Sequence, residues 1–191
     1  MGGEGFVMKR FVAVAAALSL WAVGGVLAQA SGGGSFDYHI GDSFLVAFGF
    51  PATDVAQASN GDQIVLVGTG TFNTANGAAT GVGTFQHHAA DGSPIGSGTW
   101  TANRLVTFQS FGCGGGGLPS NFCGGRATLA AHIVGHLASD PSRMVEADAL
   151  VDVICEVGNP PAGQIEGVRV NVKDLINFNK QVSGVTVFVA H

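Results

Sequence analysis

Hydrophobic and polar residues alternate along most of the chain after residue 60, which is typical of strands that bury one face. The alternation is clearest in a motif that occurs three times, as Gly68-Thr-Gly-Thr-Phe72, Gly81-Val-Gly-Thr-Phe85 and Gly96-Ser-Gly-Thr-Trp100. Asn76-Gly77 and Asp91-Gly92 separate successive copies, and such dipeptides favour the tight turns of β-hairpins. The motif therefore predicts three consecutive antiparallel strands.

The rest of the pattern predicts further short strands with tight connections. The expected strands span residues 43–50, 63–72, 81–88, 95–101, 105–111, 127–137, 144–156, 164–172 and 182–189. All six prolines lie at the ends of these segments or in turns, where a missing N–H does no harm. This arrangement predicts an all-β fold, a single antiparallel up-and-down β-barrel of about eight strands, with a β-sandwich as the alternative.

The first 30 residues have the features of a secretory signal peptide. Lys9 and Arg10 precede an apolar run at residues 11–27, and Ala28-Gln29-Ala30 supplies small residues for cleavage; residues 1–7 form an upstream extension. A retained membrane anchor is the alternative, but the polar, glycine-rich residues that follow favour cleavage. We therefore expect a secreted or periplasmic protein with a flexible N-terminus at 31–42 and one domain at 43–191, which has no membrane contact after cleavage.

The charge of the mature chain is acidic and excludes one class of partner. The whole chain has 8 Lys and Arg against 13 Asp and Glu, and signal cleavage removes Lys9, Arg10 and Glu4. The remaining basic residues form no cluster along the sequence. We therefore expect no binding to nucleic acid, because such binding needs a basic surface.

The three cysteines predict one disulfide and one free thiol. Cys113 and Cys123 flank four consecutive glycines, so we expect residues 112–125 to be a flexible loop that a Cys113–Cys123 disulfide tethers. Cys155 lies on the apolar side of its strand and is expected to be a buried free thiol, although its pairing with Cys113 or Cys123 stays open. No cysteine or histidine spacing indicates a metal site, and we expect no cofactor.

The repeated motif also places two glycines and one aromatic residue on the same face of each strand. The simpler interpretation is that large rings pack over bare backbone where the sheet coils. The functional interpretation is that Phe72, Phe85 and Trp100 line a pocket for a small apolar ligand.

Candidate catalytic residues lie on the polar face of two neighbouring strands. His132 and His136 project from residues 127–137, and Glu146, Asp148 and Asp152 project from the next strand. Antiparallel pairing brings these side chains to one face, where they are suited to acid–base chemistry or to metal binding. The simpler interpretation is a solvated outer face with neighbouring opposite charges.

Three functions are compatible with these observations. The first is a binding module that holds a small apolar or amphipathic ligand against Phe72, Phe85 and Trp100, with residues 112–125 as a lid. The second is a barrel enzyme of cyclase, isomerase or hydrolase type that uses His132, His136 and the facing carboxylates. The third is a structural or surface-interaction protein with a solid core. An apolar cavity of roughly 300 Å³ or more would favour the first function.

Overall fold

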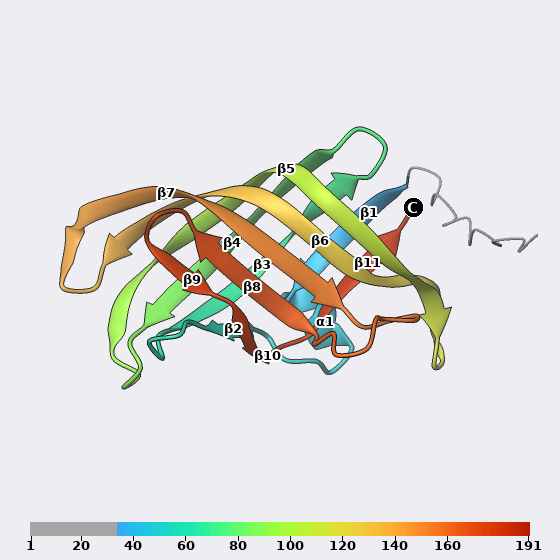
Figure 1. Cartoon of the computed structure of the whole chain (residues 1–191), viewed down its shortest axis with the longest axis horizontal. Coiled ribbons are helices and arrows are strands. Elements are labelled where there is room, and N and C mark those ends of the chain that lie inside the picture. Colours follow the sequence, from blue (N-terminus) through green and yellow to red (C-terminus); the bar gives the residue numbers. More distant parts are fainter. Residues whose placement is uncertain (1–33) are drawn as a thin grey trace, which may run out of the picture. The chain divides into compact units, whose positions relative to one another are not determined.

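The computed structural model describes residues 34–191, in which nearly all regular structure is β-strand (Figure 1). The predicted signal peptide at residues 1–30 lies outside the described residues. The strands are β1 (Ser35–Ile40), β2 (Asp54–Gln57), β3 (Gln63–Asn73), β4 (Ala78–His88), β5 (Pro94–Gly115), β6 (Leu118–Leu137), β7 (Asp140–Cys155), β8 (Gly167–Val172), β9 (Ile176–Phe178), β10 (Lys180–Ser183) and β11 (Thr186–Ala190). The helix α1 spans Ser43–Ala47. Within residues 34–191, no helix has the length and apolar character needed to cross a membrane.

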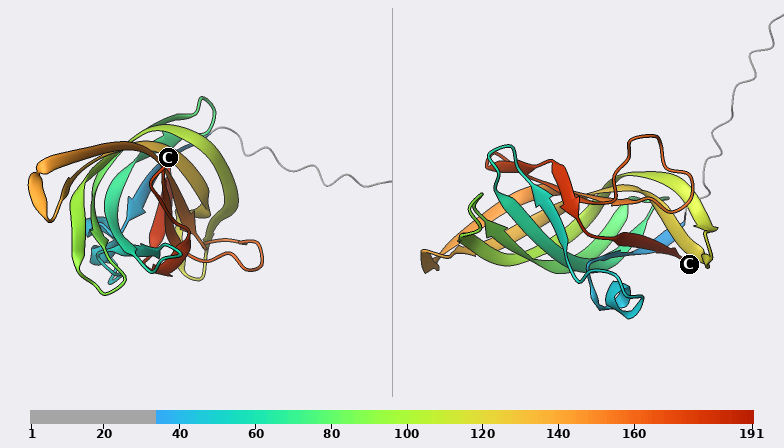
Figure 2. Two further views of the ribbon diagram at one scale, coloured as in Figure 1. Left: turned by 60° about the vertical axis from the view of Figure 1, so that its left-hand side comes forward. Right: turned by 90° about the horizontal axis from the view of Figure 1, so that it is seen from below.

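The eleven strands belong to one antiparallel sheet, and this sheet closes on itself. β3, β4, β5 and β6 pair in sequence, β6 also pairs with β11, and β11 pairs with β1, which returns to β3. Figure 2 shows the sheet curled around its own interior. The prediction of an all-β, antiparallel fold is confirmed, and the alternative β-sandwich is not formed because the strands make a single continuous sheet.

The strand order differs from that of a simple up-and-down barrel of eight strands. Along one edge β3 pairs first with β2, at residues 63–66, and then with β1, at residues 68–73. β6 pairs in the same way with β11 at residues 122–123 and with β7 at residues 125–137. Long strands can hold two partners in succession, and β6 has 20 residues. The alternation in the sequence shows which face is buried but not how many partners share one edge.

The thrice-repeated motif forms β3, β4 and the first half of β5, as predicted. Successive copies pair in register, with Gly68 opposite Gly83 and Gly83 opposite Trp100. Gly77 and Gly92 have φ angles of 72° and 85° in the intervening turns, the conformation that made these dipeptides hairpin signals. The predicted strands 95–101 and 105–111 form one strand, β5, which continues through an irregularity in its pairing between Ala102 and Arg104.

Large rings occupy the glycine face of the repeat. A Cβ atom on Gly68 or Gly83 would clash with the indole ring of Trp100, and one on Gly81 would clash with the hydroxyl of Tyr38. The Trp100 indole N–H donates to the carbonyl of Val67 at 3.1 Å, which also satisfies its polar group. The interpretation of ring packing over bare backbone therefore describes this part of the sheet.

A cluster of four phenylalanine rings fills the interior next to Tyr38. Phe36, Phe72, Phe108 and Phe188 pack with ring centroids 4.9 to 5.5 Å apart, within the range of favourable aromatic contacts. These rings therefore form a packed core at this end of the closed sheet.

The predicted strand at residues 43–50 is wrong. The Asp42 side chain accepts a hydrogen bond from the backbone N–H of Leu45 at 3.2 Å, so it caps helix α1 instead. Phe48 is 52% exposed, which shows that the alternating phenylalanines do not mark a buried face. The first strand is β1, which lies within the segment 31–42 that was expected to be flexible. The sheet therefore begins before residue 43.

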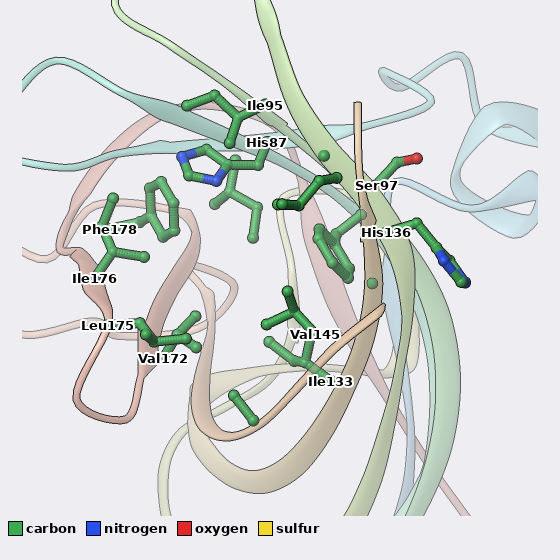
Figure 3. Close-up of a pocket in the computed structure, with 16 residues that line it drawn as sticks. His87, Ile95, Ser97, Ile133, His136, Val145, Val172, Leu175, Ile176 and Phe178 are labelled. Carbon is green, nitrogen blue, oxygen red and sulfur yellow. The ribbon is translucent and has the colours of Figure 1, made fainter. Parts of the chain in front are cut away.

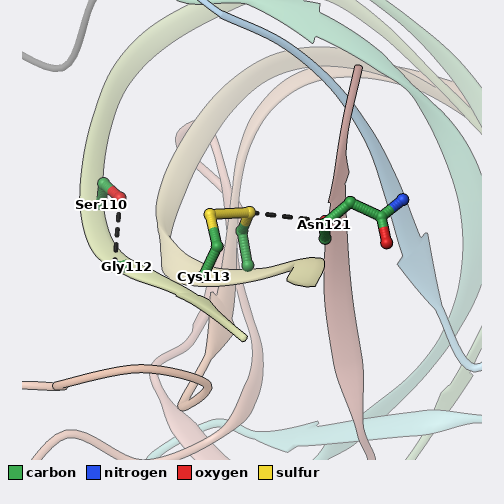
Figure 4. The surroundings of a disulfide bond; sticks show 5 residues. Ser110, Gly112, Cys113 and Asn121 are labelled. Carbon is green, nitrogen blue, oxygen red and sulfur yellow. Dashed lines mark hydrogen bonds between the residues drawn. A yellow bond between two sulfur atoms is a disulfide. The ribbon is translucent and has the colours of Figure 1, made fainter. Parts of the chain in front are cut away.

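The glycine-rich segment 112–125 is the end of a long hairpin rather than a flexible loop. β5 runs to Gly115 and β6 starts at Leu118, with a turn at Gly116 and Gly117 that uses positive φ angles. Cys113 and Cys123 face each other across these strands and form the predicted disulfide (Figure 4). Consecutive glycines thus permit a tight turn here. Cys155 is buried and free.

Candidate functional site

An apolar cavity of about 370 Å³ lies at the end of the sheet where β6 turns into β7. β3 to β9 all contribute to its wall, and Figure 3 shows the lining side chains converging on it. The apolar lining residues are Ile64, Phe85, Ile95, Ile133, Leu137, Val145, Ala147, Val172, Leu175, Ile176 and Phe178. The disulfide-bonded hairpin lies at the opposite end of the sheet (Figure 1), and no residue of 112–125 lines the cavity, so that segment is not its lid.

Glycines occupy neighbouring inward-facing positions of β5 and β6 beside the cavity. Side chains alternate along β5, so Gly96 and Gly98 take the positions on the Trp100 face that follow the packed core. On β6 the corresponding residue is Gly135, where a Cβ atom would lie 2.8 Å from the Phe85 ring. Gly96 and Gly135 therefore line the cavity, and the Phe85 ring packs over Gly135.

The cavity opens where β7 loses one of its neighbours. β7 pairs with β8 only along residues 149–154, whereas its pairing with β6 continues to Asp140. Val145 and Ala147 therefore lie on a stretch of β7 with one paired edge, and Leu175, in the turn after β8, also lines the cavity. Leu175 is 64% exposed, so an apolar side chain stands at the entrance.

His87 is the polar residue whose side chain points into the cavity. Figure 3 shows its ring beside Phe178, whereas the side chains of Ser97 and His136 point away. The rings of His87 and Phe178 meet edge to face at 5.2 Å. Nε2 of His87 lies 3.2 Å from Oδ2 of Asp62, and both side chains are largely buried. An imidazole backed by a carboxylate is thus set into an otherwise apolar wall.

A tight turn between β2 and β3 holds Asp62 in place. The backbone carbonyl of Asp62 accepts from the N–H of Ala58 at 2.8 Å, and its N–H donates to Oδ1 of Asn60 at 3.2 Å. Gly61 supplies the positive φ angle of 92° that the turn needs. The carboxylate partner of His87 is therefore fixed by backbone hydrogen bonds.

His87 was not predicted as a site residue from the sequence, although its position in the β4 segment carries a signal. His87 follows Phe85 by two residues, so alternation places both on the inward face of β4. The adjacent His88 projects to the other side, where its Nδ1 lies 3.3 Å from the carbonyl oxygen of Gly92. Extending the aromatic and glycine face of the second repeat to the end of its strand identifies the correct histidine.

The three aromatic residues predicted to line a ligand site are separated in the structure. Phe85 lines the cavity. Phe72 and Trp100 are 2% and 1% exposed within the packed core and contribute nothing to the cavity wall. The repeat thus has two roles: Phe72 and Trp100 fill the interior of the sheet, whereas Phe85 borders the cavity.

The predicted acid–base group is only partly assembled. His132 pairs directly with Asp148 across β6 and β7, with Nδ1 3.4 Å from Oδ1 of Asp148 and Nε2 3.8 Å from Oε2 of Glu146. The expected shared face is therefore formed at this point. The His132 side chain is 43% exposed on the outer surface of the sheet, and it does not line the cavity.

The remaining members of that group have separate partners. Nδ1 of His136 lies 2.9 Å from the carbonyl oxygen of Pro141, whereas Asp152 accepts hydrogen bonds from Thr128 and Arg126. Within residues 34–191, no three His, Cys, Asp or Glu side chains are placed to hold a metal ion.

The comparisons with known proteins identify no relative. No family model, curated protein or solved structure matches this chain. The geometry of the cavity is therefore the basis for any functional assignment.

A second group of ionisable side chains is buried where β10 leads into β11. Asp54 is fully buried, and its pKa is raised to about 8. Burial is the larger cause, and the nearby charge of Glu166 is the smaller one. Neither carboxylate oxygen of Asp54 has a well-formed hydrogen bond among the described residues, although the backbone N–H of Val185 lowers the pKa in part. Sequence reasoning did not identify this group, because its members come from distant segments.

The other members of the buried group are Glu166 and Cys155. Glu166 accepts from the backbone N–H groups of Thr186 and Glu156 at 3.0 and 3.1 Å, and burial raises its pKa. Burial likewise raises the pKa of the Cys155 thiol to about 12. These side chains do not line the cavity, so we assign them to the stability of the fold rather than to the site.

Proposed function

We propose that this protein is an exported binding module that holds a small apolar or amphipathic ligand in the cavity bordered by Phe85, His87 and Phe178. The observation that carries this proposal is the cavity itself. Its volume of about 370 Å³ is within the range of small-molecule sites, and its wall is apolar apart from one inward-pointing histidine.

Water is a poor occupant for such a space. The volume corresponds to roughly a dozen molecules of liquid water, but an apolar wall leaves most of them without protein hydrogen bonds. An apolar ligand that displaces weakly held water gains affinity. The exposed side chain of Leu175 at the entrance supports the same interpretation, since it would be covered by an occupant.

Two features support export. The N-terminal 30 residues have the pattern of a secretory signal. The Cys113–Cys123 disulfide is compatible with an oxidising compartment.

The test is binding of a neutral fluorescent probe, N-phenyl-1-naphthylamine, to the purified protein. We expect a saturable rise in emission with one site per chain. The variant Ala147→Trp fills the cavity and should abolish that signal, whereas Val82→Trp, at a 62% exposed position on β4, should leave it unchanged. Equal binding by both variants and the original protein would refute the proposal.

Native mass spectrometry of protein purified from its own host provides an independent test. A retained ligand would add a discrete mass that Ala147→Trp does not carry. Peptide mapping of the same sample reports whether the chain begins after residue 30, which tests the proposed export signal.

One observation favours an acid–base enzyme as a second candidate. His87 with Asp62 behind it has the arrangement of a general base and its orienting carboxylate, and it lies in the cavity, unlike His132. A cyclase, isomerase or hydrolase would convert a ligand recovered from the host. Wild-type protein that returns the ligand chemically unchanged after prolonged incubation would exclude turnover of that compound.

A further inference from the structure

We propose that the ligand is a neutral apolar molecule with one hydroxyl group, and that this hydroxyl donates a hydrogen bond to Nδ1 of His87. This inference rests on the proposed function and specifies the chemical class of the ligand. It follows from the hydrogen bond of His87, from the charges near the cavity and from the way the imidazole is set among apolar side chains.

The Asp62 carboxylate determines which nitrogen of His87 carries the proton. An ionised carboxylate only accepts hydrogen bonds, so the contact of 3.2 Å between Oδ2 and Nε2 requires a proton on Nε2. In the neutral imidazole Nδ1 is then an acceptor. Among residues 34–191, no protein group hydrogen-bonds to Nδ1 of His87, and Nδ1 is not one of the buried atoms that lack a partner, so it stays accessible to solvent. The site therefore presents a free acceptor, which calls for a donor on the ligand.

The charges of the site disfavour an anionic ligand. None of the residues that line the cavity is Lys or Arg. A protonated His87 would already be matched by Asp62, so a ligand carboxylate would be buried without a cation of its own, at considerable cost. A hydroxyl is a small neutral donor that satisfies Nδ1 without bringing further charge into the apolar wall.

The position of His87 sets where the hydroxyl lies. Its ring sits against Phe178 and near Ile95 in Figure 3, so the acceptor is surrounded by apolar side chains. In the empty cavity water can reach this acceptor, but a ligand that covers Nδ1 without donating to it would leave the acceptor buried and unpaired, which is costly. A ligand that lacks the donor would therefore bind more weakly than one that carries it.

The experiment compares three probes that share a naphthalene body: 2-naphthol, 2-methoxynaphthalene and 2-naphthoate. Isothermal titration measures each dissociation constant with the purified protein. We expect 2-naphthol to bind about three- to tenfold more tightly than 2-methoxynaphthalene, the ratio for one net hydrogen bond, with 2-naphthoate weakest. The methoxy probe has the larger apolar surface, so hydrophobic burial alone would produce the opposite order.

Variants of the two adjacent histidines provide the matched control. His87→Leu should remove the preference for 2-naphthol, so that 2-methoxynaphthalene binds at least as tightly as 2-naphthol, while binding of 2-methoxynaphthalene is retained. His88→Leu should preserve the preference for 2-naphthol, because that side chain projects away from the cavity. Nitrogen NMR of wild-type protein needs no stable variant: 2-naphthol should shift the Nδ1 resonance of His87, whereas 2-methoxynaphthalene should not.

The outcomes separate this inference from the proposed function. If none of the three probes binds and N-phenyl-1-naphthylamine fails as well, the proposed function is refuted and the inference falls with it. If the two neutral probes bind with equal affinity, or if 2-naphthoate binds most tightly, the binding function stands and the hydroxyl inference is overturned.

Discussion

The indole ring of Trp100 lies against the bare backbone of Gly83, where a Cβ atom would clash with the indole nitrogen. The two residues are direct partners across β4 and β5, and the indole N–H reaches over to the carbonyl of Val67 on β3. The position of the ring is therefore fixed both by close packing against Gly83 and by a hydrogen bond to Val67. This contact joins the three copies of the repeated motif into one packed layer.

Gly83→Ala is expected to destabilise the fold by about 1 to 3 kcal/mol, because the added methyl group would overpack the Trp100 contact. Thr84→Ala, at the adjacent exposed position, should change the free energy of unfolding by less than about 0.5 kcal/mol. Urea denaturation followed by tryptophan fluorescence measures both. A Gly83→Ala variant as stable as the original protein would show that the ring does not depend on the bare backbone.

Stability should fall as the pH rises from about 4 to 8, because Asp54 holds its proton more tightly in the folded state than in the unfolded chain. Its pKa is about 8 in the fold against 3.8 for the ordinary group, so the folded state binds more protons throughout this interval. The stabilisation is fully present below pH 4 and is lost by pH 8. The predicted loss is on the order of 5 kcal/mol, and the raised pKa of Glu166 acts in the same direction.

Asp54→Asn isolates this contribution, since the amide is neutral at every pH in the interval. We expect the variant to lose most of the decline in unfolding free energy between pH 4 and 8, and to be more stable than the original protein at pH 8. Denaturation curves at several pH values provide the measurement. Parallel pH profiles for the two proteins would assign the dependence to other groups.

Reduction of the Cys113–Cys123 disulfide should cost about 2 to 3 kcal/mol of stability, the value that the chain-entropy relation predicts for a loop of this length. Thermal unfolding with and without a reductant measures the change, and the variant Cys113→Ser with Cys123→Ser should reproduce it. Binding of N-phenyl-1-naphthylamine should be unaffected, because the disulfide lies at the end of the sheet away from the cavity. Loss of binding on reduction would show that the two ends are coupled.

Cys155 should be unreactive in the folded protein. Its side chain is buried, and burial raises the pKa of its thiol to about 12, so almost no reactive thiolate is present at neutral pH. Ellman's reagent should detect no thiol in the native state and one per chain in guanidinium chloride without reductant. Rapid labelling of the native protein would contradict its burial.

His132→Ala should leave ligand binding unchanged and alter the unfolding free energy by less than about 0.5 kcal/mol. The reason is that its contacts with Asp148 and Glu146 are made on the outer, solvent-exposed surface. Titration of N-phenyl-1-naphthylamine and urea denaturation test the two parts. A marked loss of affinity in His132→Ala would indicate that the outer face with His132, Glu146 and Asp148 takes part in binding.

Much of the fold was predictable because its signals are local. The Asn76-Gly77 and Asp91-Gly92 turns specify hairpins through their own backbone preferences, and the alternation between them specifies which face is buried. The same reasoning failed at residues 43–50, where Asp42 caps a helix. The failure has a physical cause, since alternating phenylalanines give the same pattern whether or not a neighbouring strand is available to pair with them.

The candidate site was harder to predict because its parts come from distant segments. Phe85 was named from the sequence, but glycines also lie under the packed ring of Trp100, so the repeated motif does not distinguish a cavity wall from a packed core. Asp62 and His87 are 25 residues apart and meet only because β3 and β4 pair in one register. The residues next to Asp62 and His87 in the sequence do not indicate this contact.

By itself the sequence determined the antiparallel β fold, the turns and the inward face of each repeated strand, because turn preference and alternation act over a few residues. The sequence favoured the Cys113–Cys123 disulfide, but the structure decided its pairing. Tertiary structure alone decided that one end of the closed sheet is filled by Trp100 and Tyr38 while the other is hollow. That difference depends on which side chains of different strands contact one another inside the closed sheet. Strand order and register determine these contacts.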